Sequence, residues 1–174
     1  MYNVCELKQK TNEIISREII FGDMFRGVDA DMNEKYMKIA FNEAKKAYKR
    51  SEMPVGAVVV KNGKIIGKGY NKKEKTGNAI MHAEIIAINK ACKKNKDWRL
   101  NDCEIYVTLE PCMMCMGAIV ESRIKKVYCG VKNKKNNLCN KKICGEENID
   151  IKYGMLENDI IKQIKNFFNN IRKQ

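Results

Sequence analysis

The chain has 174 residues, of which 44% are hydrophobic and 32% charged, and this balance is typical of a single globular domain with its own core. It contains no apolar run as long as a membrane span and no apolar segment of a secretory signal near its start, so we expect a cytoplasmic protein without membrane contact. The formal net charge is +13, and the excess lies after residue 30, because residues 1–30 hold four basic and five acidic side chains. Such a basic domain favours a polyanionic partner, although a lysine-rich composition throughout would explain the same charge.

The organisation of the chain changes at about residue 31. Residues 1–31 have mixed charge and weak periodicity, and we expect either a loosely attached N-terminal extension or a natural initiator at Met32. Residues 32–174 form the one remaining domain. Its first predicted helix begins at Asn33, where apolar residues recur at three- and four-residue spacing, and Pro54 ends that segment.

Strands and helices alternate through this domain. Asn62-Gly63 between two apolar runs predicts a hairpin of strands at 55–60 and 64–70. The pattern then predicts, in order, a polar loop at 71–78, a helix at 79–93, a strand at 104–109, a helix from Pro111 to about 122, a strand at 126–131, a basic loop at 132–147, a strand at 149–153 and a C-terminal helix with an apolar stripe from Ile160 to Ile171. This alternation predicts an α/β fold with helices on both faces of one sheet.

The chemistry-bearing residues form one constellation. The single histidine of the chain, His82, stands thirty positions before Cys112, which begins a Cys-x-x-Cys with Cys115. Eight cysteines without an export signal do not indicate disulfides, because the cytosol keeps thiols reduced. His82, Cys112 and Cys115 would give a zinc ion three ligands and leave its fourth position open for water. This is the arrangement of a catalytic zinc, so we predict one Zn²⁺ per chain. Both ligand clusters fall at predicted helix starts, where the helix dipole favours thiolates.

Glu84 follows the histidine by two positions. In the first turn of a helix this offset turns the side chain away from the ligand direction and into a cavity beside the metal. A carboxylate there can accept a proton from water and pass it to a base and to a leaving amine.

Each of these residues also has a simpler interpretation. A histidine at a helix start is often a cap or a surface residue, a Cys-x-x-Cys can be a redox pair, and a glutamate there often only complements the helix dipole. The combination favours the metal site, because His-x-Glu followed by Pro-Cys-x-x-Cys is the signature of zinc-dependent nucleobase deaminases. A structural zinc would normally have a fourth protein ligand, and the sequence places none there.

The chain resembles the cytidine deaminase-like superfamily and, within it, the bacterial tRNA-specific adenosine deaminases. The resemblance is close over residues 33–130 and rests on the stretches Met53-Pro54-Val55-Gly56-Ala57-Val58, His82-Ala83-Glu84-Ile85, Asp97-Trp98-Arg99-Leu100 and Thr108-Leu109-Glu110-Pro111-Cys112. It implies a three-layer α/β/α fold around a mostly five-stranded mixed sheet, and a homodimer. It also implies hydrolysis of adenosine to inosine at the wobble position of a tRNA anticodon, with release of ammonia.

The resemblance implies roles for seven residues: Glu84 as the catalytic proton carrier, His82, Cys112 and Cys115 as zinc ligands, and Asn71, Val55 and the backbone N–H of Ala83 as contacts to the base. The three base contacts have weaker support than the zinc set. By itself the sequence favours Asn71 as a turn residue after a strand, and the simpler interpretation of Val55 is a valine in the core of a strand.

One segment departs from the tRNA enzymes, which usually carry an acidic residue and a glycine-rich loop after the position of Val131. Here that segment begins Lys132-Asn133-Lys134-Lys135. Because the loop at 132–147 lies where flanking substrate would be read, the alternative is a small-molecule deaminase acting on cytosine, guanine or a nucleoside. The basic charge favours RNA, whose anticodon bases are already splayed. A further alternative is a zinc-bound RNA-binding subunit without catalytic activity, but such subunits tend to lose the glutamate that is present here as Glu84. The last alternative is a thiol redox protein, which bound zinc would exclude.

Overall fold

The computed structural model describes residues 34–133 and 147–172, nearly all of which belong to one compact unit, Tyr36–Gln174. The predicted N-terminal extension at 1–31 and most of the predicted loop at 132–147 lie outside the described residues. Within the described ranges, no helix is both long and apolar enough to cross a membrane.

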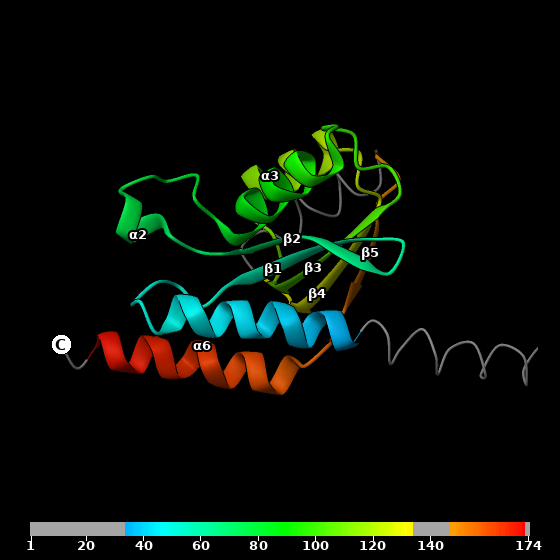
Figure 1. Ribbon diagram of the computed structural model, residues 1–174. Coiled ribbons are helices and arrows are strands. Elements are labelled where there is room, and N and C mark those ends of the chain that lie inside the picture. Colours follow the sequence, from blue (N-terminus) through cyan, green and yellow to red (C-terminus); the bar gives the residue numbers. More distant parts are fainter. Residues whose placement is uncertain (1–33, 134–146, 173–174) are drawn as a thin grey trace, which may run out of the picture. The chain divides into compact units, whose positions relative to one another are not determined.

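A five-stranded mixed sheet forms the centre of this unit, as predicted. Its strands are β1 (Gly56–Lys61), β2 (Lys64–Tyr70), β3 (Cys103–Leu109), β4 (Lys126–Val131) and β5 (Asp150–Tyr153). They lie in the order β2-β1-β3-β4-β5 (Figure 1). Strand β1 pairs antiparallel with both β2 and β3, whereas β3, β4 and β5 run parallel to one another.

The hairpin between β1 and β2 turns at Asn62 and Gly63, which confirms the prediction from the Asn-Gly pair. Both residues have positive φ angles, 48° and 73°. Two successive left-handed residues make the type I′ turn, whose twist matches that of the flanking strands. The hydroxyl of Tyr36 donates a hydrogen bond of 2.7 Å to the carbonyl oxygen of Gly63 and so ties the turn to the helix at 34–48.

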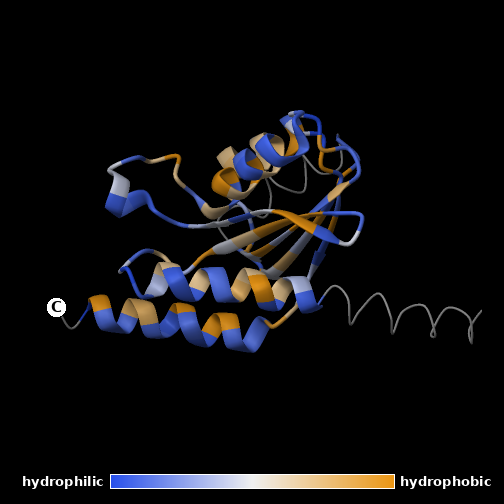
Figure 2. Ribbon diagram, in the orientation of Figure 1, coloured by the Kyte–Doolittle hydropathy of each residue, from blue (hydrophilic) through white to orange (hydrophobic). Residues whose placement is uncertain are grey.

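Helices cover both faces of the sheet, and this confirms the predicted three-layer α/β/α fold. One face carries α3 (Ala83–Asn95) and α4 (Met113–Glu121). The other carries the helix at 34–48 and α6 (Glu157–Ile171), which lie side by side (Figure 1). Apolar and polar residues alternate along the ribbon of α6 (Figure 2), as expected for a helix with one buried face.

The two cores follow from the alternating direction of side chains along each strand. The core under α3 and α4 contains Val59, Ile105 and Val107, and the core under the other two helices contains Val58, Val60 and Tyr106. All six side chains are at most 2% exposed, so the sheet is buried on both faces.

Two differences from the prediction concern the connection between β2 and α3. The helix predicted at 79–93 begins only at Ala83, because the side chain of Asn78 accepts a hydrogen bond of 3.1 Å from the N–H of Ile80 and forms a turn there. The predicted polar loop at 71–78 contains a one-turn helix, α2 (Lys73–Thr76), which ends at Gly77 with φ of 60°. Neither feature produces an apolar periodicity in the sequence.

Glycines in β2 allow α3 to lie directly against the sheet. A Cβ on Gly67 would collide with the carbonyl oxygen of Ala87, and a Cβ on Gly69 would collide with that of Ala83. Because the colliding atoms belong to the helix backbone, they cannot move without shifting the whole helix. The first turn of α3 is therefore held at a fixed distance from the end of β2.

We expect Gly67→Ala to lower the free energy of unfolding by about 1–3 kcal/mol or more, because α3 must move away from the sheet to make room. Chemical denaturation followed by circular dichroism measures this change. The matched control is Lys68→Ala in the same strand, whose side chain is exposed and whose removal should cost less than about 0.5 kcal/mol. An equal loss of unfolding free energy in the two variants would contradict the close packing of α3 against β2.

Candidate metal centre and active site

The strand directions bring distant parts of the chain to one edge of the sheet. Strand β1 begins where β2 ends, since Gly56 pairs with Tyr70, and its antiparallel pairing with β3 places the end of β3 at the same edge. Strand β4 also ends there, because Leu109 pairs with Val131. The residues just beyond these four strand ends therefore lie close together.

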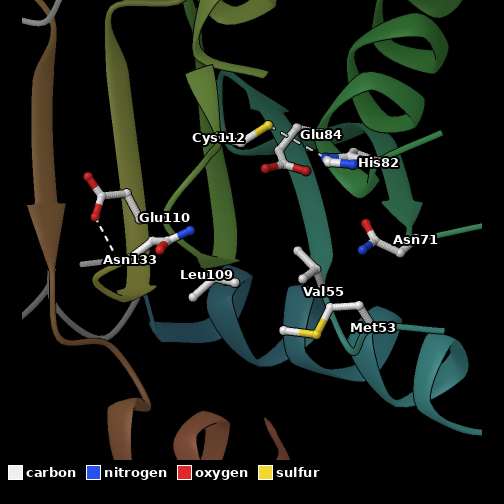
Figure 3. Close-up of a pocket in the computed structure, with 9 residues that line it drawn as sticks. All are labelled: Met53, Val55, Asn71, His82, Glu84, Leu109, Glu110, Cys112 and Asn133. Carbon is white, nitrogen blue, oxygen red and sulfur yellow. Dashed lines mark hydrogen bonds between the residues drawn. The ribbon is translucent and has the colours of Figure 1, made fainter. Parts of the chain in front are cut away.

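The three predicted ligands meet at this edge. Their candidate ligand atoms all lie within 4.8 Å of one another. The Nδ1 atom of His82 is 3.6 Å from the Sγ atom of Cys112 (Figure 3) and 3.5 Å from the Sγ atom of Cys115. His82 and Cys112 are the N-cap residues of α3 and α4, and Cys115 lies in the first turn of α4, so the predicted placement at helix starts is confirmed.

These distances and donors fit a zinc ion. A tetrahedral zinc with bonds of about 2.3 Å to sulfur and about 2.0 Å to nitrogen places the two kinds of ligand atom about 3.5 Å apart. One imidazole and two cysteine sulfurs are also donors that zinc prefers. Three protein ligands are the number found in catalytic zinc sites, which keep one coordination position open.

The two cysteines differ in acidity when no metal is bound. A hydrogen bond from the Cys115 side chain lowers the pKa of the Cys112 thiol to about 5. The same hydrogen bond, together with burial, raises the pKa of Cys115. Without a bound metal, Cys112 is therefore the more acidic of the two thiols.

Glu84 lies in the first turn of α3, is 3% exposed and lines the pocket beside the cluster (Figure 3). Its Oε2 atom is buried and has no hydrogen-bond partner among the described residues. Burial raises the pKa of its carboxyl group to about 7. The carboxyl group thus lines the same pocket as His82 and Cys112 and keeps one oxygen available for a further hydrogen bond.

The pocket itself has a volume of about 120 Å³. Its wall is formed by Met53, Val55, Asn71, His82, Glu84, Leu109, Glu110, Cys112 and Asn133 (Figure 3). Two of the three predicted base contacts, Asn71 and Val55, are thus in the wall. The backbone N–H of Ala83, the third, donates a hydrogen bond of 2.8 Å to Oδ1 of Asn71, which orients the amide of that side chain.

Glu110, for which no role was predicted, is 2% exposed and also lies in the wall of the pocket. Its carboxylate accepts hydrogen bonds from the N–H of Asn133, at 2.7 Å, and from the hydroxyl of Tyr153, at 3.0 Å. Glu110 thereby fixes the start of the segment that follows β4. The one local sign of a role for Glu110 is its position between a strand and Pro111. Its hydrogen-bond partners could not be predicted, because they are 23 and 43 residues away in the sequence.

Comparison with known proteins agrees with this geometry. Residues 30–131 match the family model described as the cytidine and deoxycytidylate deaminase zinc-binding region. The chain therefore belongs to this family of zinc-binding deaminases.

Its relatives include enzymes that act on tRNA. The tRNA-specific adenosine deaminase of Bacillus subtilis (strain 168) is 40% identical over 148 residues, which cover 82% of this chain and 92% of that protein. A solved tRNA:A34 deaminase structure from a study of A-to-I editing at the wobble position of transfer RNA is 32% identical, with a TM-score of 0.69, and the match covers 74% of this chain and 98% of that one. Guanine deaminase from Bacillus subtilis is 36% identical with a TM-score of 0.56, over 61% of this chain and 68% of that one. The predicted resemblance to the tRNA-specific adenosine deaminases is confirmed.

We expect bound zinc to protect Cys112 from alkylation. In protein stripped with a chelator, the lowered pKa keeps Cys112 as a reactive thiolate from neutral pH down to about pH 6, and reactivity falls as the pH drops through 5. Mass spectrometry after iodoacetamide treatment should show rapid labelling of the stripped protein and at least about tenfold slower labelling after zinc is restored. Buried Cys129 is the internal control. Equal labelling of Cys112 with and without zinc would argue against its role as a ligand.

Proposed function

We propose that this chain hydrolyses adenosine to inosine at the wobble position of a tRNA anticodon and releases ammonia. The observation that carries the proposal is the buried Glu84 carboxyl group, which faces the pocket beside the His82, Cys112 and Cys115 cluster. The similarity to tRNA-specific adenosine deaminases supports the choice of substrate.

We assign one zinc ion per chain to the cluster, and when bound it supplies a Lewis acid that makes water nucleophilic near neutral pH. Glu84 carries the protons. Its carboxylate accepts a proton from the attacking water and gives it to N1 of the adenine ring. It then accepts the remaining proton of the hydroxyl group on C6 and gives it to the amino group, which leaves C6 as ammonia. A pKa of about 7 suits this role, because such a group both accepts and donates protons at neutral pH.

We assign base recognition to Asn71, Val55 and Ala83. Val55 offers an apolar surface to one face of the base, and Asn71 offers an amide whose orientation is held by the N–H of Ala83. An anticodon base is already unpaired, so bringing it into the pocket costs less than extruding a base from a duplex. The net charge of +13 supports binding of the flanking phosphates. We place this reaction in the cytoplasm.

We also propose that the enzyme is a homodimer. Helix α4 is apolar nearly all round, and such a helix is usually buried on every side. Here Met113 is 60% exposed and Met114 is 38% exposed. A Cβ on Gly117 would meet no atom within 4 Å in the described part of the chain. This open apolar face supports contact with a second copy of the chain.

We expect the zinc-loaded protein to form inosine in an arginine-tRNA anticodon stem-loop that carries adenosine at the wobble position. Glu84→Gln should lower kcat by about 10²–10⁴-fold, because the amide cannot carry a proton. Mass spectrometry of the digested RNA detects inosine, and zinc content should stay unchanged in the variant. An active Glu84→Gln variant would contradict the assigned role.

The same assay with free guanine, cytosine and adenosine tests the alternative, which the similarity to guanine deaminase favours. An RNA enzyme should lose activity steeply between about 50 and 200 mM salt, since phosphate contacts release counterions. Activity on a free base without salt dependence would replace the tRNA proposal by the small-molecule one.

We expect Gly117→Lys to convert a dimer into a monomer. The new side chain has room in the single chain and should not weaken the helix, because lysine has a helix propensity better than glycine by about 0.5–1 kcal/mol. Analytical ultracentrifugation should give twice the chain mass for the parent and the single chain mass for the variant. A monomeric parent, or a dimeric variant, would contradict the placement of the interface on α4.

A further inference from the structure

One of the buried glutamates, Glu52, lies outside the catalytic machinery. Glu52 is 1% exposed, although it stands in a short connection between the helix at 34–48 and β1. Its two carboxylate oxygens accept hydrogen bonds from the backbone N–H groups of Glu74, at 3.1 Å, and Lys75, at 2.8 Å. These are N–H groups of the first turn of α2, which lack partners within the helix itself.

The segment that Glu52 holds has little else to fix it. Residues 73–80 are all exposed, and Figure 2 shows the ribbon of α2 as hydrophilic. The N-cap residue of α2, Lys72, makes no side-chain capping bond among the described residues. A side chain from 22 residues upstream takes the place of the usual Ser, Thr or Asp cap. Hydrogen bonds to an ionised carboxylate are about twice as strong as neutral ones.

Glu52 is itself held rigidly. The helix at 34–48 is followed by Ser51 in the left-handed conformation, with φ of 58°. The N–H of Glu52 then donates a hydrogen bond of 3.1 Å back to the carbonyl oxygen of Ala47 in the last turn of that helix. This helix-terminating turn directs the chain inward, so the carboxylate links the helix to the α2 segment.

The held segment starts and ends at the active site. It spans residues 72–81, between Asn71 and His82, which both line the pocket. Its ends are tied by a hydrogen bond of 3.0 Å from the N–H of Lys72 to the carbonyl oxygen of Met81. The segment therefore leaves the fold and returns to it at one place, directly beside Asn71 and His82. Figure 1 shows α2 on the connection that leads away from β2 and returns to α3.

We propose that Glu52 is a positioning residue, which holds the 72–81 segment at the rim of the pocket so that Asn71 and the exposed lysines of this segment meet the RNA around the target adenosine. This inference rests on the proposed function. It assigns Glu52 to substrate binding rather than to zinc binding or proton transfer. The segment carries the exposed Lys73 and Lys75 and the half-buried Lys72 against the single acidic Glu74, and this charge suits contact with phosphate groups.

The test compares Glu52→Gln with the parent and with Glu43→Gln. Glutamine has the shape of glutamate but presents an NH₂ group to one of the two N–H donors, so one bond is replaced by a clash of donors. Glu43 is the matched control, because it is also buried, at 7% exposed, but pairs with Lys46 on its own helix. Glu52→Asp serves as a second variant that keeps the charge, in case the amide weakens folding.

We expect Glu52→Gln to raise KM for the anticodon stem-loop about tenfold, with kcat changed less than about threefold and zinc content unchanged. Amide hydrogen exchange in residues 72–81 should become at least about tenfold faster, and Glu52→Asp should restore part of both properties. Glu43→Gln should leave KM and the exchange of this segment at parental values.

Three results would overturn the inference: unchanged exchange in residues 72–81, an unchanged KM in Glu52→Gln, or an equal rise in KM in Glu43→Gln. The failure of the proposed function looks different, because the parent itself would then form no inosine. In that case the exchange of residues 72–81 and the affinity of the stem-loop, measured by fluorescence anisotropy, are still compared between parent and Glu52→Gln. Equal values in both would overturn the role of Glu52 independently of catalysis.

Discussion

The meeting of two helix N-termini at one edge of the sheet is the constraint on which the site depends. The first residues of α3 and α4 supply the candidate metal ligands, and glycines in β2 set how close α3 can approach. The N-cap residues of both helices, His82 and Cys112, make no capping hydrogen bond with the described residues. A Ser or Asp at such a position typically stabilises a helix by about 1 kcal/mol. These two positions thus forgo local helix stability and leave their side chains available to a metal.

Three of the buried glutamates show how the surroundings of a side chain give the same residue type different roles. Glu52 and Glu110 are each satisfied by two hydrogen-bond donors, and both act as fixed links between distant segments. Glu84 is equally buried but keeps one oxygen without a partner in the described part of the chain, and burial raises its pKa to about 7. The satisfied carboxylates hold the pocket walls, whereas the unsatisfied one is left free to exchange protons.

Local signals made most of the fold and the metal cluster predictable. The Asn62-Gly63 turn, the alternating strands, the His82-Ala83-Glu84 motif and the Cys112-x-x-Cys115 motif each lie within a short stretch of the chain. The start of α3 was placed four residues too early, because the turn at Asn78 depends on a side-chain hydrogen bond that leaves no periodicity. Helix α2, Glu52 and Glu110 could not be found in this way, since each depends on hydrogen bonds between residues at least 22 positions apart.

The pairing of β1 with β3 also has a consequence for the order of events during folding. His82 lies on the stretch that follows the hairpin, and Cys112 lies just after β3, so the two can meet only once β3 has docked beside β1. In an unfolded chain, Cys112 and Cys115 are the two of these three ligands that the sequence holds close together, and two donors are an incomplete set. Tight metal binding must then follow the formation of the sheet, which is a slow step because it joins distant parts of the chain. A metal bound by all three ligands therefore stabilises only the folded state.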